Sequence, residues 1–177
     1  MTTQLIPLLA ILNTLGALIG TGMTTFAEVF YTHAVSDGEI DHHERKYLRR
    51  LFRGFAFGIT LVILSNIALI VFEYLVPYAP ESVLTVPFWS LQILTLIIIF
   101  VGWLLSKRQI QWWLGSSAVL VAWWLILLID LGLLNAAGFF EIIFTYIIAT
   151  ILAAGALSYL RMHMRELEPL LITHNDD

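Results

Sequence analysis

The sequence IQWWLGSSAVLVAWWLILLI, from Ile110 to Ile129, contains 20 consecutive residues without Asp, Glu, Lys, Arg or His. A helix of about 20 such residues is long enough to cross the roughly 30 Å hydrocarbon core of a bilayer. Four more uninterrupted stretches occupy residues 5–27, 54–72, 83–106 and 142–160. None alternates polar and apolar residues, so the pattern favours helices over barrel strands. We therefore predict an all-α, polytopic membrane protein, a bundle of five transmembrane helices.

The expected spans lie at about residues 5–34, 50–76, 84–106, 110–133 and 138–163, in a single domain covering residues 1–168. Residues 169–177 should form a short cytoplasmic tail, because Pro169 disfavours the helical conformation of the residue before it. No basic segment precedes the first span and no cleavage pattern follows it, so this span is expected to be a retained helix rather than a signal peptide.

The amino-acid composition is typical of a membrane protein and excludes several classes of function. The 177 residues are 59% hydrophobic and 12% charged, about half the charge of an ordinary globular chain. A net charge of -4 provides no overall basic field for a nucleic acid. The absence of cysteine removes thiol chemistry, iron-sulfur clusters and Cys-ligated zinc.

The positive charges predict the orientation. All nine Lys and Arg lie between the first and second spans, between the third and fourth, or after the fifth. Because cationic residues near membrane helices stay on the cytoplasmic side, the expected topology is N-out and C-in, in an inner or plasma membrane.

Three acidic residues lie near the expected outer ends of three different spans: Glu73, Asp130 and Glu141. One interpretation is that they reach the headgroup layer and are solvated there. The other is that they share one buried site, where no Lys or Arg is within reach. They must then carry protons or bind a hard cation from outside, with Asn13 and Asn135 as further oxygen donors.

On the expected inner side, Glu28 has Arg49, Arg50 and Arg53 nearby, which favours an ordinary ion pair. His33 and His163 end the first and fifth spans. Two histidines on separate helices can hold a haem or a transition metal, although most interfacial histidines hold neither.

The segment DGEIDHHE, from Asp37 to Glu44, resembles the second half of an EF-hand calcium loop, with Asp37, Glu39, Asp41 and Glu44 as the acidic positions. The first half of such a loop is missing, because His33 and Val35 stand where its first ligands belong. We favour helix capping, with Asp41 as the N-cap and Glu44 at the N3 position.

Small residues indicate where helices approach. Gly16 and Gly20, and Gly54 and Gly58, form two small-xxx-small pairs. Trp123 and Trp124 fall within the fourth span, where an indole N–H needs a partner, so both are expected to face other helices.

No catalytic triad, HExxH, Walker loop or Rossmann glycine pattern is present, and an enzyme is not expected. The leading hypothesis is a cation or proton permease, either monomeric or homo-oligomeric, with an outer carboxylate site and no cofactor. The alternatives are a membrane subunit or assembly factor that binds a partner protein, and a haem-bearing electron-transfer protein.

Overall fold

The computed structural model describes residues 5–34, 42–75 and 85–172. Within these ranges it describes the backbone but not the side chains of residues 33–34, 42–45, 48–49, 73 and 164–172. The described residues contain no strand and form five helices: α1 (Leu5–Ala34), α2 (His42–Leu75), α3 (Val86–Ser106), α4 (Trp112–Asp130) and α5 (Phe139–Ile172). All five are long and apolar enough to cross a membrane, which confirms the predicted helical class.

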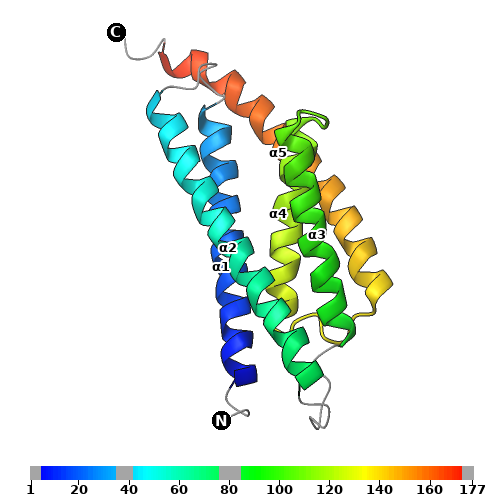
Figure 1. Cartoon of the computed structure of the whole chain (residues 1–177). Coiled ribbons are helices and arrows are strands. Elements are labelled where there is room, and N and C mark those ends of the chain that lie inside the picture. The colour runs from blue at the N-terminus through cyan, green and yellow to red at the C-terminus, as the bar shows by residue number, and fades with distance from the viewer. Residues whose placement is uncertain (1–4, 35–41, 76–84, 173–177) are drawn as a thin grey trace.

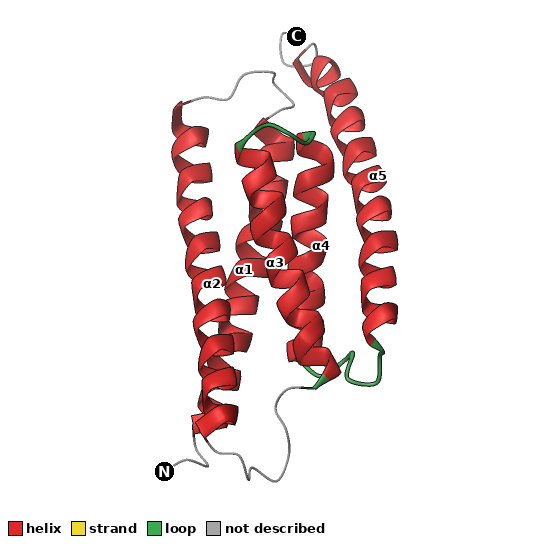
Figure 2. Ribbon diagram, turned by 45° about the vertical axis from the view of Figure 1, so that its right-hand side comes forward, coloured by secondary structure: helices red, strands yellow, loops and turns green. Residues whose placement is uncertain are grey.

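Consecutive helices run in opposite directions (Figure 1). The starts of α1, α3 and α5 therefore lie at one end of the bundle, with the ends of α2 and α4, and we call this the N-terminal end. The end of α5 marks the opposite, C-terminal end. The two connections that the structure describes, from α3 to α4 and from α4 to α5, lie at these two ends (Figure 2).

α1 and α2 pack as a close pair, and the predicted glycine contacts account for it. A Cβ atom added to Gly58 would lie 2.9 Å from the carbonyl oxygen of Gly16 and 2.9 Å from the backbone nitrogen of Gly20. The two backbones thus touch where they cross, as small-xxx-small pairs allow. Gly54, the other glycine of the α2 pair, lies instead against the side chain of Met23.

α4 is the central helix of the bundle and contacts α1, α3 and α5. Its Trp123 is completely buried, lies edge-on to Phe55 of α2 with ring centroids 5.7 Å apart, and covers Gly20 of α1. Thr21 donates a hydrogen bond to the backbone carbonyl of Trp123. Trp124 was expected to face other helices as well, but it is 46% exposed because the next residue along a helix points about 100° away.

α5 has the largest exposed share of the five spans and packs mainly on α4. Its backbone stays helical through Pro169 to Ile172, so the prediction that the helix stops at Pro169 is wrong. A proline this close to the end of a helix removes only the N–H that would bond to the carbonyl of residue 165.

Candidate functional site

A polar cluster lies near the N-terminal end of the bundle, between α1, α2 and α4. Asn13 of α1 donates a hydrogen bond from Nδ2 to Asp130 Oδ1 of α4, at 2.8 Å. Ser65 of α2 donates one to Asn13 Oδ1, at 3.0 Å. Asn13 and Ser65 are both buried. The amide of Asn13 thus orients the carboxyl group through one hydrogen bond while Ser65 fixes the amide itself.

Two further polar groups beside these hydrogen bonds have no hydrogen-bond partner among the described residues. Asp130 Oδ2 is inaccessible to solvent, and so are both polar side-chain atoms of Asn66, a residue only 1% exposed. Buried polar atoms nearly always have a partner, and each unpaired one costs about 1–3 kcal/mol. These atoms therefore indicate a ligand, ion or water at this place.

A cavity of about 190 Å³ supplies the space. Asn13, Asn66, Asp130 and Asn135 line it, together with residues at the starts of α1 and α3. Its volume is far above the roughly 10–15 Å³ that one water molecule needs. We call these four residues and Ser65 the Asp130 cluster.

The electrostatic setting of Asp130 is unfavourable for a bare negative charge. Asp130 is the last residue of α4, and the C-terminus of a helix carries a partial negative charge of its own. Every Lys or Arg with a described side chain belongs to the first turns of α2, the turn from α3 to α4, or the last part of α5, all at the opposite end. No described cationic side chain is therefore available to neutralise this carboxyl group.

The three acids singled out in the sequence are not all in this cluster. Glu141 is exposed, and its Oε2 accepts a hydrogen bond from the backbone N–H of Gly138, at 2.9 Å, which caps the start of α5. Glu141 does not line the cavity. The side chain of Glu73 lies outside the described residues. The structure thus joins Asp130 to Asn13, and leaves Glu141 on the surface of its own helix.

A second polar site lies toward the C-terminal end. Glu28 of α1 is buried and forms an ion pair with Arg161 of α5, whose Nη2 lies 2.7 Å from Glu28 Oε2. The guanidinium group also lies 5.2 Å from the ring centre of Tyr31 and 3.5 Å from the hydroxyl of Ser116 on α4. The sequence suggested a partner on α2 because those arginines are nearer along the chain. The cation is instead supplied by α5.

The remaining candidates lie apart from both sites or outside the described residues. His163 is exposed and stacks on Tyr159 of the same helix, at a centroid distance of 6.1 Å. The side chains of His33 and of Asp37, Glu39, Asp41 and Glu44 lie outside the described residues. Among the described residues, no three His, Asp or Glu side chains gather as a metal site would require.

An apolar layer separates the two polar sites. Ala17, Val62, Trp123 and Ile126 are fully buried between them. Along α1, the buried polar residues resume beyond this layer with Thr21 and Thr24 and end at Glu28. The cluster around Asp130 is thus closed off from the far end of the bundle by close packing.

Ser65, Asn66 and Arg161 were not identified from the sequence. Ser65 and Asn66 are the one adjacent pair of polar residues in the span from Gly54 to Phe72, which is a signal that the sequence does contain. For Arg161 the sequence contains no such signal, because its partner, Glu28, is 133 residues away.

Comparison with known proteins adds no identification: no family model, curated protein or solved structure matches this chain. The class is therefore defined by the fold alone, as a helical protein with five helices able to span a membrane.

Proposed function

We propose that this protein is a membrane carrier for protons or small hard cations, with Asp130 as the binding carboxyl group. One observation supports the proposal most directly: Asp130 Oδ2 is buried without a partner among the described residues, in a residue that lines a polar cavity. Burying a carboxyl group inside a membrane protein is energetically unfavourable, and intramembrane acids typically mark ion or proton pathways.

The chemistry of the cavity favours a proton or a hard cation. Asp130, Asn66 and Asn135 offer carboxylate and amide oxygens, the ligands preferred by hard cations, and the chain has no thiolate for a soft metal. Asn13 is a positioning residue, since its hydrogen bond to Oδ1 leaves Oδ2 directed to another partner.

The packing favours a carrier over an open pore. The layer formed by Ala17, Val62, Trp123 and Ile126 has no exposed surface and blocks the way from the cavity to the other end. Transport through this bundle therefore requires a second conformation in which the layer opens and the cavity closes. Such alternation of access around a fixed site is the usual mode of secondary transporters.

Asp130→Asn is expected to reduce flux to the level of protein-free vesicles. The substitution keeps the shape of the side chain and an oxygen for Asn13, but it removes the charge and the exchangeable carboxyl proton. The measurement uses proteoliposomes with an entrapped pH dye and, separately, a sodium-sensitive dye. Size-exclusion chromatography of the purified variant shows whether the fold is retained.

Glu141→Gln is the matched control, because it changes an acid at the same end whose carboxylate only caps its own helix. It should transport like the unmodified protein. Loss of flux in both variants would contradict a site centred on Asp130. Absence of flux in the unmodified protein, together with a co-purifying membrane protein, would favour the alternative function of a non-transporting subunit.

The orientation belongs to the same proposal. Positive residues near helix ends are retained on the cytoplasmic side, so the cavity should open to the outside. A reporter fused after Asp177 should then be cytoplasmic, and one inserted between Pro77 and Ser82 should be external. Both reporters on one side of the membrane would contradict five crossings.

A further inference from the structure

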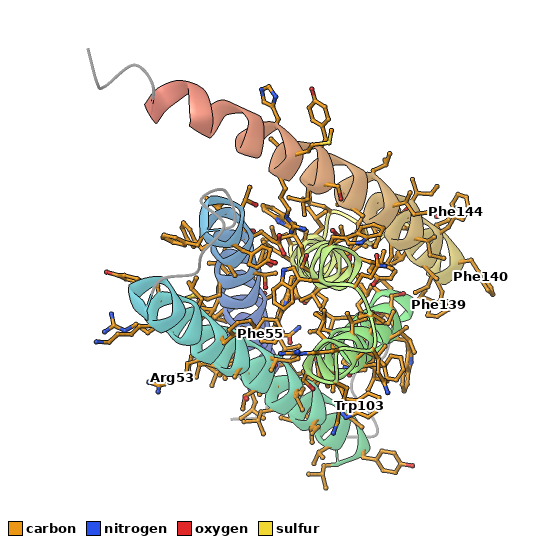
Figure 3. The ribbon with its side chains drawn as sticks, turned by 90° about the horizontal axis from the view of Figure 1, so that it is seen from above. Arg53, Phe55, Trp103, Phe139, Phe140 and Phe144 are labelled. Carbon is orange, nitrogen blue, oxygen red and sulfur yellow. The ribbon has the colours of Figure 1, made fainter. Side chains whose placement is uncertain are left out.

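A second cavity lies apart from the Asp130 cluster. It is found toward the C-terminal end, has a volume of about 540 Å³, and is lined by residues of α1, α2, α3 and α4. Figure 3 views the bundle from this end, with Phe55, one of its lining residues, directed inward from α2. Its volume is typical of a site for a small molecule, about 300–1,000 Å³.

The lining of this cavity is suited to hydrocarbon and offers little to a polar substrate. Twelve of the sixteen lining residues are apolar or glycine. The four polar ones already have partners within the protein. Thr24 donates to the carbonyl of Gly20 and Ser106 to that of Trp103, while Glu28 is paired with Arg161 and Ser116 lies beside the same guanidinium.

Cations lie at the C-terminal rim of the cavity on one of its walls. The exposed Lys107 and Arg108 directly follow the lining residue Ser106. Arg53 of α2 is also exposed, but it points away from the bundle (Figure 3). Among the described side chains at this end, the one acid is Glu28, which is paired with Arg161.

We infer that this cavity binds an anionic phospholipid, with an acyl chain inside it and the phosphate at its rim, beside Lys107 and Arg108 of the α3–α4 turn. The apolar lining selects the chain, and the rim selects the negative headgroup, since clusters of Lys and Arg beside membrane helices attract anionic lipid. Trp112 lines the cavity at the first residue of α4, a depth at which indole rings favour the headgroup boundary. This inference does not depend on the proposed transport.

Gly102 provides a sharp test, because it lines the cavity and an added Cβ would meet nothing within 4 Å. In Gly102→Phe the ring should occupy the space of the acyl chain. Gly155→Phe is the matched control: its Cβ also meets nothing within 4 Å, but Gly155 is on α5, away from the cavity.

The full-length protein is exchanged into micelles containing equal amounts of phosphatidylglycerol and phosphatidylcholine, and retained lipid is counted by native mass spectrometry. The unmodified protein and Gly155→Phe should retain one phosphatidylglycerol in preference to phosphatidylcholine. Gly102→Phe should lose that adduct, and a thermal melt checks that it is folded. The double variant Lys107→Gln, Arg108→Gln changes only exposed residues and should lose the headgroup preference while still retaining lipid.

Two results would overturn the inference. Equal retention of phosphatidylglycerol by Gly102→Phe and the unmodified protein would exclude the cavity as the site. Equal retention of the two lipids by the unmodified protein would exclude selection of an anionic headgroup, whatever the behaviour of Gly102→Phe.

Discussion

Arg161→Met should destabilise the protein by about 3–5 kcal/mol, the cost typical of leaving one member of a buried ion pair without its partner. The substitution leaves Glu28, which is only 6% exposed, without its cation. It also removes the group that joins α1, α4 and α5, because the guanidinium contacts Glu28, Tyr31 and Ser116. Thermal melting and titration with denaturing detergent measure the loss.

Arg50→Met is the matched control. Arg50 is an exposed arginine whose guanidinium lies 5.8 Å from the ring centre of Tyr47, so it also lies over an aromatic ring but has no buried acid. Its loss should change stability by no more than about 0.5 kcal/mol. The double variant Glu28→Met, Arg161→Met should recover most of the stability, since removing both charges is often nearly neutral. If Arg161→Met melted no earlier than Arg50→Met, the ion pair would not stabilise the bundle.

Gly58→Ala should be far more disruptive than Gly54→Ala, although the two glycines are one turn apart on α2. The new methyl group at residue 58 would lie 2.9 Å from backbone atoms of Gly16 and Gly20, and backbone cannot move aside without separating α1 from α2. At residue 54 the nearest atom, at 2.8 Å, belongs to the flexible side chain of Met23.

The expected cost of Gly58→Ala is about 1–3 kcal/mol, as for overpacking of a core, and Gly58→Leu should exceed it. Gly54→Ala should cost much less, because the side chain of Met23 can move aside. The gain in helix propensity, up to about 1 kcal/mol, is the same at both positions. Melting temperatures of the two variants side by side test the comparison. Equal destabilisation would mean that α1 and α2 do not cross with their backbones in contact.

The carboxyl groups show how far sequence reasoning reaches in this chain. Depth in the membrane can be read from the sequence, so Asp130 and Glu141 were both assigned to helix ends. The direction in which each side chain points cannot be read from the sequence, because it depends on how the helix is rotated about its axis. Asp130 turns inward to Asn13, whereas Glu141 binds the N–H of Gly138 at the surface.

The same reasoning applies to the aromatic and basic residues. Trp123 and Trp124 are the same residue type at neighbouring positions of one span. Only the packing of α4 places Trp123 in the centre of the core and leaves Trp124 half exposed. Glu28 has several arginines near it along the chain, yet the one that neutralises it comes from α5. Proximity in sequence is a poor guide once helices are about 30 residues long.

The sequence alone determined that five helices form, because the lengths of apolar stretches are local properties of a helix. The spacing of small residues also indicated Gly16, Gly20 and Gly58 as contact positions, but only packing shows that Gly54 meets the side chain of Met23 and not a helix backbone. Tertiary structure decided which buried polar groups meet. Asn13, Ser65 and Asp130 come from three helices, and Glu28 and Arg161 from two more distant segments. Hydrogen bonds and ion pairs act over about 3 Å, so they exist only after helix rotation and packing have been set.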